Sequence, residues 1–235
     1  MLIFGIDTCC MAATAALLRD NTVVSETVTN CGKTHSEKMM PQIENMFKSC
    51  GIDPDEVDAF AAAVGPGSFT GVRIGVATVK AMAQVQNKPC VAVSTLEALA
   101  YSSKYFDGIV SPILDARRNQ VYNALFECGK SEMKRLTPDR ALALDELLKE
   151  LKALDKDIIF MGDGVYAFKD EIIKALGSKA FFAPETVIMN LGGAVAALGR
   201  EKLEKGDVVS YADLVPSYIR LSQAERERLE KQEKL

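Results

Sequence analysis

The stretch LIFGIDTCCMAATAALL at residues 2–18 decides the fold, because its plan recurs later in the chain. An apolar strand ends in Asp7, the turn TCCM follows, and a second apolar strand returns to Leu18. Residues 109–126, IVSPILDARRNQVYNALF, repeat this plan around Asp115. We therefore expect two similar domains that face each other, with one carboxylate from each hairpin pointing into the cleft between them.

A second shared feature follows each hairpin, where an apolar strand runs into a glycine loop and then into a helix. The first instance is AFAAAVGPGSFTG at 59–71, and the second is IIFMGDGVYAF at 158–168. Three hairpin-connected strands followed by alternating helices and strands are typical of the ribonuclease H-like unit, which is duplicated in the actin-like ATPase superfold. We expect that α/β fold here, with domains at 1–104 and 105–235 and a charged C-terminal tail. The predicted helices are 34–50, 71–86, 143–154, 165–176 and 190–204, and Ser94 opens a further one.

Composition limits the class of protein. Hydrophobic residues make up 48% of the 235, and no run approaches the ~18 apolar residues that a membrane span needs. The N-terminus lacks the basic flank and the cleavage site of a signal peptide. The six cysteines form no CxxC pair, so we expect reduced thiols in a cytoplasmic protein without a membrane partner. A net charge of −4 argues against unaided nucleic-acid binding, so any RNA is expected to be held by a partner.

The glycine loop GPGSFTG at residues 65–71 allows two interpretations. Its free backbone N–H groups at the start of a helix suit a phosphate, although the spacing matches neither the dinucleotide fingerprint nor the P-loop. Alternatively, the first glycines supply turn dihedrals, Thr70 caps the helix, and Gly71 and Gly75 let another helix approach closely. Arg73 in the first helical turn opposes the helix dipole, so we expect a carboxylate or a partner to hold it.

The single histidine, His35, stands at the start of a predicted helix, where Thr34 and Glu37 form a capping box. Metal sites on a helix commonly use ligands at positions i and i+4, and the i+4 residue here is Met39. We therefore expect His35 to be a helix-start residue, and we expect the chain to hold no metal.

Two predicted helices suggest a surface for a partner, because the first has a broader apolar face than a small domain normally buries and the second has a pair of closely spaced glycines. The first, at 35–50, is rich in methionine, and the second, at 71–86, contains the Gly71 and Gly75 spacing. We expect the two helices to lie side by side and to bind an equivalent helix pair, either of a partner or of a second copy. The predicted partner-binding residues are Met39, Ile43, Met46, Val72, Arg73, Val76 and Val79.

A set of motifs along the chain resembles the TsaB family, formerly called YeaZ. The motifs are GIDT at 5–8, THSEKMMPQI at 34–43, GPGSFTGVRIG at 65–75, ILDARRNQVY at 113–122 and PSYIR at 216–220. The resemblance covers nearly the whole chain, in order and at family-like spacing. It implies the actin-like ATPase fold and a requirement in the threonylcarbamoyladenosine modification at position 37 of tRNAs that read ANN codons.

The resemblance also implies that the chain does not perform the chemistry itself. In the related system, TsaC makes threonylcarbamoyl-adenylate, TsaD transfers the carbamoyl group to N6 of the adenosine, and the ATPase TsaE joins the complex. The implied partners are a TsaD homologue and a TsaE homologue, with tRNA bound only through the complex and a homodimer formed by the isolated chain. The implied cofactors, ATP and a metal, belong to those partners. Met39 replaces the second histidine of the HxxxH pair with which TsaD holds its metal.

The interdomain cleft is where a residual nucleotide site is expected. The predicted residues of this site are Asp7, Asp115, Arg117, Arg118, Gly162 and Gly164. Both turns lack the glycines of a phosphate loop, since TCCM replaces them in the first turn and two arginines occupy the second. We expect one arginine to pair with Asp115, and the other to face the cleft or the surface used by TsaD and TsaE.

Two other functions remain open. A small-molecule kinase of the same superfold would use Asp7 or Asp115 to orient water or Mg²⁺, with GDG at 162–164 near the adenosine, but it needs a glycine-rich phosphate loop. A metallopeptidase of the glycoprotease type would need a second histidine. The sequence lacks both features, and function follows from the site and not from the fold.

Overall fold

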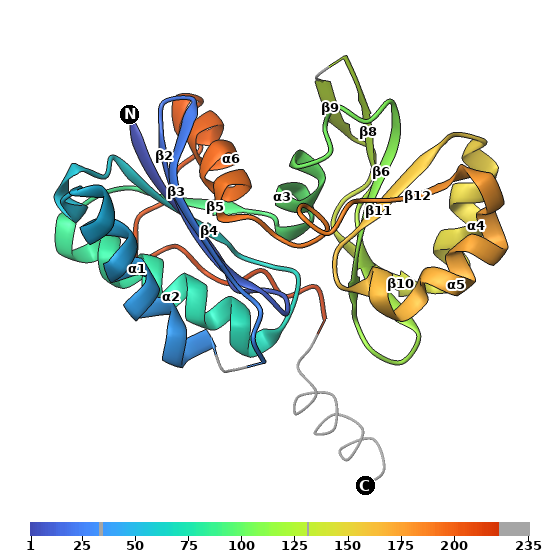
Figure 1. Ribbon diagram of the computed structural model, residues 1–235, viewed down its shortest axis with the longest axis horizontal. Helices are drawn as coiled ribbons and strands as arrows, with labels where there is room; N and C mark the ends of the chain where they lie inside the picture. Colours follow the sequence, from blue (N-terminus) through green and yellow to red (C-terminus); the bar gives the residue numbers. More distant parts are fainter. Residues whose placement is uncertain (33–34, 131, 221–235) are drawn as a thin grey trace, which may run out of the picture.

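The computed structural model describes residues 1–32, 35–130 and 132–220 and contains two β-sheets that lie side by side (Figure 1). The first sheet has five strands in the order β3-β2-β1-β4-β5. Its strands are β1 (Leu2–Asp7), β2 (Ala13–Arg19), β3 (Thr22–Thr29), β4 (Ala59–Ala63) and β5 (Cys90–Val93). Because β1 pairs antiparallel with β2 and parallel with β4, the turn after Asp7 lies at the same edge of the sheet as the loop after β4.

The second sheet has seven strands, and its main path, β10-β7-β6-β11-β12, repeats the order of the first. Its strands are β6 (Gly108–Asp115), β7 (Gln120–Asn123), β8 (Phe126–Gly129), β9 (Glu132–Arg135), β10 (Arg140–Ala143), β11 (Ile158–Met161) and β12 (Ala180–Phe182). The central strand β6 pairs antiparallel with β7 and parallel with β11, as β1 does with its own neighbours. The predicted repeat is therefore present, and the turn after Asp115 is the equivalent of the turn after Asp7.

Helices cover both faces of the first sheet (Figure 1). The helices are α1 (His35–Cys50), α2 (Phe69–Gln86), α3 (Thr95–Tyr101), α4 (Leu144–Leu154), α5 (Gly164–Leu176) and α6 (Gly192–Glu204), with 3₁₀ turns η1 (Pro54–Glu56) and η2 (Gly177–Lys179). α1 and α2 lie on one face of the first sheet, and α6 lies on the other. α4 and α5 lie on the side of the second sheet that faces away from the first. Throughout the described ranges, every helix is too short or too polar to cross a membrane.

The position of α6 differs from the predicted division into residues 1–104 and 105–235. α6 packs against β1, β2 and β4 of the first sheet, although it follows the whole second sheet in the chain. The approach is close because Gly5 lacks a side chain: a Cβ there would lie 2.5 Å from the backbone N of Ala196. The first domain therefore consists of the first sheet with α1, α2 and α6, and the second domain consists of the second sheet with α4 and α5.

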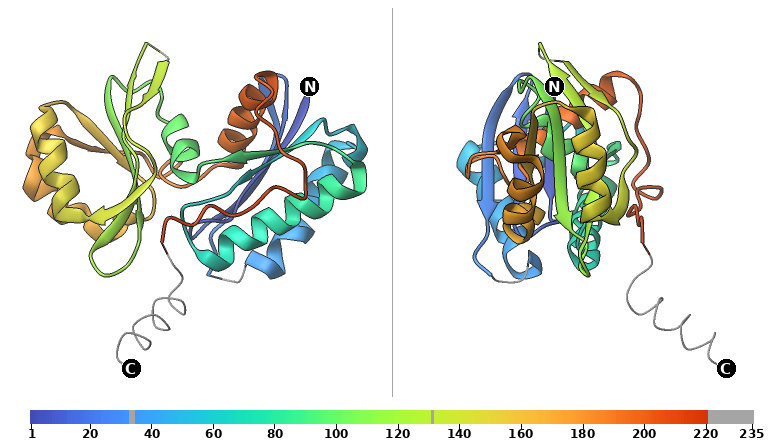
Figure 2. Two further views of the ribbon diagram at one scale, coloured as in Figure 1. Left: turned by 180° about the vertical axis from the view of Figure 1, so that it is seen from behind. Right: turned by 90° about the vertical axis from the view of Figure 1, so that its right-hand side faces the viewer.

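Residues 205–220, called the strap below, also return to the first domain. The strap runs back along the first domain and ends between the two domains (Figure 2). Cys90 and Val209 exchange two backbone hydrogen bonds of 2.9 Å, and the Lys80 ammonium donates to the carbonyl oxygens of Ala212 and Leu214 at 3.1 Å each. The strap is therefore fastened to the edge strand β5 and to α2.

Two predicted elements have different boundaries in the structure. The return strand expected at 120–126 is divided into β7 and β8, because β7 pairs with β10 whereas β8 pairs with β9. Helix α2 begins at Phe69, and its cap is Ser68 instead of the predicted Thr70, since the Ser68 hydroxyl accepts a hydrogen bond from the backbone N of Gly71 at 3.3 Å. The capping box predicted from Thr34 and the charged tail after residue 220 lie outside the described residues.

Candidate functional site

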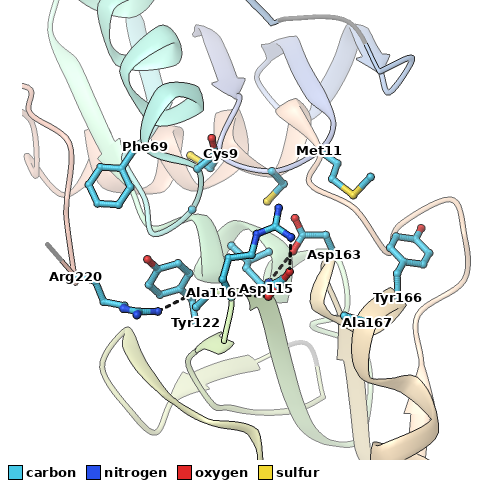
Figure 3. Close-up of a pocket in the computed structure, with 15 residues that line it drawn as sticks. Cys9, Met11, Phe69, Asp115, Ala116, Tyr122, Asp163, Tyr166, Ala167 and Arg220 are labelled. Atoms are coloured by element: carbon cyan, nitrogen blue, oxygen red, sulfur yellow. Dashed lines mark hydrogen bonds and ion pairs between the residues drawn. The ribbon is translucent and has the colours of Figure 1, made fainter. Parts of the chain in front are cut away.

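A cleft of about 700 Å³ lies between the two domains, where the two hairpin turns meet (Figure 3). The first domain contributes the turn after β1 and the glycine loop before α2. The second domain contributes the turn after β6, the start of α5 and one tyrosine of β7. The cleft is lined by Cys9, Cys10, Met11, Gly67, Ser68, Phe69, Leu114, Asp115, Ala116, Arg117, Tyr122, Asp163, Tyr166, Ala167 and Arg220. The repeat therefore builds a cleft at the place that the sequence predicts.

Asp115 is held by its own turn. Its carboxylate accepts a hydrogen bond from the backbone N of Arg117 at 2.8 Å and forms an ion pair with the Arg117 guanidinium at 3.2 Å. The predicted pairing of Asp115 with one arginine is therefore present. The other arginine, Arg118, is exposed and does not line the cleft. Of its two predicted positions, the cleft and the partner surface, the cleft is therefore excluded.

The backbone of this turn is strained. Arg117, Arg118 and Asn119 have left-handed φ values of 63°, 56° and 57°. This conformation costs a residue with a side chain roughly 1–2 kcal/mol. The turn is closed by two backbone hydrogen bonds, from Ala116 N to Gln120 O at 3.0 Å and from Gln120 N to Arg117 O at 3.2 Å. These bonds and the Asp115 contacts hold the conformation that brings Arg117 to the cleft.

Asp163 faces Asp115 from the start of α5. Its Oδ1 accepts a hydrogen bond from the backbone N of Asp115 at 3.0 Å. Burial raises the pKa of Asp163 above its usual value, and the hydrogen bond from the Asp115 backbone offsets part of this rise. The Asp163 carboxylate thus joins the start of α5 to the backbone at the end of β6.

The glycines beside Asp163 have a packing role. A Cβ on Gly162 would lie 2.3 Å from the carbonyl oxygen of Ile113, and one on Gly164 would lie 3.0 Å from the same atom. Gly162 also has a φ of 95°, which favours glycine. Neither glycine lines the cleft, so their predicted place in a nucleotide site is not supported. The two glycines let α5 approach β6, and Asp163, which stands between them, lines the cleft.

Asp7 is buried beneath the cleft and does not line it. Its carboxylate accepts hydrogen bonds from the backbone N of Cys9 at 2.7 Å and from the side-chain amide of Asn190. Burial raises the pKa of Asp7 to about 6, because the loss of water penalises the charged form more than these hydrogen bonds favour it. The prediction that Asp7 points into the cleft is wrong, since Cys9, Cys10 and Met11 of the same turn line the cleft in its place.

The glycine loop before α2 packs against the turn after β1. The backbone N of Ser68 donates to the carbonyl oxygen of Cys9 at 2.7 Å, and a Cβ on Gly67 would lie 2.4 Å from the same oxygen. A Cβ on Gly71 would lie 2.0 Å from the carbonyl oxygen of Thr8. Gly67 and Gly71 therefore allow the close approach of the turn after β1, whereas the sequence predicted the close approach of another helix. The observed contacts are those of the turn interpretation of the loop.

Arg73 is held within the chain. Its Nε donates to the Tyr218 hydroxyl at 2.7 Å, and its guanidinium carbon lies 5.6 Å from the centroid of the Tyr218 ring. Tyr218 in turn stacks on Phe69, with centroids 4.8 Å apart and an interplanar angle of 14°. The group that holds Arg73 is therefore a tyrosine of the strap instead of the expected carboxylate or partner.

The apolar residues that were predicted to bind a partner lie in the core of the first domain. Each of the following is at most 4% exposed: Met39, Ile43, Met46, Val72, Val76 and Val79. Their helical spacing does indicate a buried face, but the first sheet and the neighbouring helix of the same chain cover that face. The prediction that these side chains are presented to a partner is wrong, and Arg73 is the exposed member of the predicted set.

A different part of the same helix pair is open to solvent. A groove of about 530 Å³ lies beside α1 and the residues that follow it. Met40 is 51% exposed and lines this groove together with Phe47, Ile52 and Met82. Lys48 and Glu44 also line the groove and form an ion pair with each other. The groove therefore combines apolar side chains with three charged residues, Glu44, Lys48 and Asp53.

His35 is the first residue of α1, and its Nε2 lies 3.0 Å from the carbonyl oxygen of Cys10. This contact joins the start of α1 to the turn after β1. Met39, at position i+4, is buried. Among the residues that the structure describes, no three His, Cys, Asp or Glu side chains are grouped as a metal site.

The sequence analysis missed three polar residues around the cleft. Asp163 could have been predicted, because it is a carboxylate at the start of a predicted helix and stands between Gly162 and Gly164. Arg220 ends the PSYIR motif, which served only to identify the family. The role of Asn190 could not be predicted from the sequence, because its hydrogen-bond partner Asp7 lies near the other end of the chain.

Known proteins match the chain over its whole length. Residues 23–228 match the family model described as TsaD, tRNA N6-adenosine threonylcarbamoyltransferase. The tRNA threonylcarbamoyladenosine biosynthesis protein TsaB of Bacillus subtilis (strain 168) is 38% identical over 232 residues, which cover 99% of this chain and 100% of that protein. Identity at this level over both complete lengths shows the family.

Two crystal structures show the same fold. A Pseudomonas aeruginosa protein with similarity to peptidase YeaZ superposes with a TM-score of 0.79 at 22% identity, over 93% of this chain and 99% of that one. The ROK hexokinase of Thermus thermophilus superposes with a TM-score of 0.50 at 10% identity, over 86% of this chain and 100% of that one. The predicted duplicated units of the actin-like ATPase superfold are thus confirmed. The chain belongs to the TsaB (YeaZ) family of tRNA threonylcarbamoyladenosine biosynthesis proteins.

Proposed function

We propose that the chain is a non-catalytic partner subunit in the transfer of the threonylcarbamoyl group to N6 of adenosine 37 in tRNAs that read ANN codons. In this proposal a TsaD homologue performs the transfer, a TsaE homologue joins the complex, and the chain binds the TsaD homologue directly. The family match supports the pairing, because the matching model is that of the transferase itself. Two related chains with one fold are suited to join through equivalent surfaces, as two copies of one chain do.

The engagement of the carboxylates around the cleft is the observation that carries the non-catalytic role. Asp115 is paired with Arg117, Asp163 accepts a hydrogen bond from the Asp115 backbone, and Asp7 is buried under hydrogen bonds. Phosphoryl transfer requires carboxylates that are free to hold Mg²⁺ beside a phosphate-binding loop. The chain's own groups occupy these positions, which supports an architectural role for the cleft.

The charge of the chain supports an indirect contact with tRNA. A net charge of −4 does not favour the neutralisation of a run of phosphates by this chain. In the proposed complex the tRNA is therefore bound by the other subunits, which also hold the ATP and the metal.

The groove beside α1 is the surface that we assign to the TsaD homologue. Met40 stands half-exposed at a cavity whose interior includes Phe47 and Met82, so an apolar side chain from a partner helix fits there. Anchors of this kind carry most of the binding energy in protein interfaces. In the isolated chain a second copy occupies the same groove and forms a homodimer.

The Met40→Glu variant tests this assignment, because it places a charge in the groove without changing the core. We expect the dissociation constant for the TsaD homologue to rise at least tenfold and threonylcarbamoyladenosine formation in a reconstituted reaction to fall with it. Val85→Glu is the matched control, since Val85 is 86% exposed on α2 and does not line the groove. Val76→Glu is unsuitable, because Val76 is buried and its replacement unfolds the chain.

Titration calorimetry separates the possible failures. Equal binding of Met40→Glu and wild type would move the interface away from the groove and leave the proposed role intact. A wild-type chain that does not bind the TsaD homologue, or a reaction that reaches full rate without the chain, would refute the proposed function.

A further inference from the structure

The last residues of the strap are seated on the glycine loop of the first domain. The backbone N of Ser217 donates to the carbonyl oxygen of Val64 at 2.7 Å. Gly65 leaves space for this approach, since a Cβ there would lie 2.6 Å from the carbonyl oxygen of Ser217. The next residue, Tyr218, stacks on Phe69 and accepts the hydrogen bond from Arg73. The orientation of this part of the strap is therefore determined by backbone and side-chain contacts together.

Arg220 extends from this seat to the second domain. One of its terminal nitrogens donates to the carbonyl oxygen of Ala116 at 2.7 Å, across the cleft that both residues line (Figure 3). Ala116 belongs to the strained turn after β6, next to Arg117. Within the described part of the strap, this is the hydrogen bond that reaches the second domain.

In the described residues, the domains are also joined by two passages of the chain and by side-chain contacts at the first of them, where the Ser94 hydroxyl donates to the Asp139 carboxylate at 2.6 Å and Arg135 pairs with Glu97 at 3.2 Å. The first passage runs through α3 to β6, and the second runs from β12 to α6. In Figures 1 and 2 these passages lie close together, and the end of the strap lies below them. Two neighbouring connections form a hinge about which domains rotate. A third link placed away from the hinge opposes that rotation.

We propose that the strap is an interdomain tie, in which the hydrogen bond from Arg220 to Ala116 keeps the cleft at its present width. Tyr218 is the positioning residue, because its stacking on Phe69 and its bond to Arg73 direct Arg220 toward the turn. When the tie is broken, the domains separate about the two chain passages and solvent enters the cleft. Other contacts of the strap, such as the hydrogen bonds between Val209 and Cys90 of β5, hold it to the first domain whether the tie is formed or broken.

The thiols of Cys9 and Cys10 report on this motion, since both are buried and both line the cleft. In the Arg220→Ala variant we expect iodoacetamide to alkylate them about tenfold faster than in wild type, as measured by peptide mass spectrometry. Cys128 is the internal reference, because it is 4% exposed, lies in β8 and does not line the cleft. Its rate should stay unchanged. The radius of gyration from small-angle X-ray scattering should rise in parallel.

Two further variants separate a tie from a general loss of stability. Arg220→Lys keeps a cationic donor and should restore most of the protection of Cys9 and Cys10. Tyr218→Ala removes the seat of Arg220 and should expose the same two thiols. Faster alkylation of Cys128 to the same degree would show that Arg220→Ala loosens the whole fold, and would overturn the proposal. Unchanged rates at Cys9 and Cys10 in both Arg220→Ala and Tyr218→Ala would overturn it equally.

Discussion

The side-chain amide of Asn190 donates a hydrogen bond to the carboxylate of Asp7, although the two residues lie 183 positions apart in the chain. The carbonyl of the same amide accepts a hydrogen bond from the Cys10 thiol at 3.1 Å. Asn190 and Asp7 are fully buried, and Asn190 stands just before α6. This contact therefore joins the start of the returning helix to the first hairpin.

Replacement of Asn190 by alanine should leave the Cys10 thiol without its acceptor and should leave Asp7 with the Cys9 backbone N–H but without its side-chain donor. We expect Asn190→Ala to lower the free energy of unfolding by roughly 1–3 kcal/mol, which is the usual penalty for a buried polar group that loses its hydrogen bond. Asn30→Ala, the same change at an exposed residue, should shift it by less than ~0.5 kcal/mol. Urea denaturation of both variants measures the difference, and equal effects would show that the Asn190 contact contributes nothing.

The raised pKa of Asp7 makes stability depend on pH. Between pH 3.8 and about 6 the folded state retains the proton on Asp7 while the unfolded state has lost it, so the free energy of unfolding falls as the pH rises through this window. The complete loss is about 3 kcal/mol and persists at neutral pH. Asp7→Asn removes this contribution. The difference between wild type and variant, followed by urea denaturation from pH 4 to pH 8, should therefore change in favour of the variant, and a difference independent of pH would contradict the shift.

Helix α2 should not tolerate a side chain at Gly71. Gly71→Ala adds a Cβ that would lie 2.0 Å from the Thr8 backbone. We expect this change to lower the free energy of unfolding by roughly 1–3 kcal/mol, in spite of the higher helix propensity of alanine. Gly193→Ala is the control within another helix, because a Cβ there would meet only side-chain atoms, the nearest 3.2 Å away on Val23. Thermal unfolding should separate the two variants clearly. A Gly71→Ala protein as stable as wild type would mean that the turn after β1 yields easily.

Arg118 combines an exposed side chain with a left-handed backbone, so two substitutions can separate their effects. Arg118→Gly should relieve the backbone strain and stabilise the fold by ~1 kcal/mol, whereas Arg118→Ala should leave stability nearly unchanged. Both variants lack the guanidinium. We expect both to lower threonylcarbamoyladenosine formation in the reconstituted system by weakening assembly, and to recover when the chain is supplied in excess. Failure to recover at saturating concentration would give Arg118 a part in the chemistry.

The duplicated architecture was predictable because its signal is local. Apolar runs that end in Asp7 and Asp115, each followed by a turn and a second apolar run, indicate hairpins wherever they occur. Their recurrence, with a glycine loop and a helix after each, predicts that both sheets share one strand order. The shared order is the one observed.

The occupant of each buried face was not predictable from the same patterns. The apolar residues of α1, among them Met39 and Ile43, recur at helical spacing, which indicates that one side of the helix is covered. The spacing is the same whether a sheet of the same chain or a partner covers that side. The apolar pattern of residues 190–204 likewise indicates a packed helix and does not name the sheet on which it packs. For the same reason, the Asp7 and Asn190 contact could not be derived, since it depends on where α6 lies.

The return of α6 to the first sheet bears on the order in which the protein matures during synthesis. Residues 1–104 leave the ribosome first, yet one face of β1, β2 and β4 stays uncovered until residues 192–204 have been made. An N-terminal half released early would expose that apolar face to water and to other chains, so we expect it to aggregate. The first domain to be translated is thus the last to be completed, and the second domain acts as an insertion that has to fold before the sheet preceding it can close.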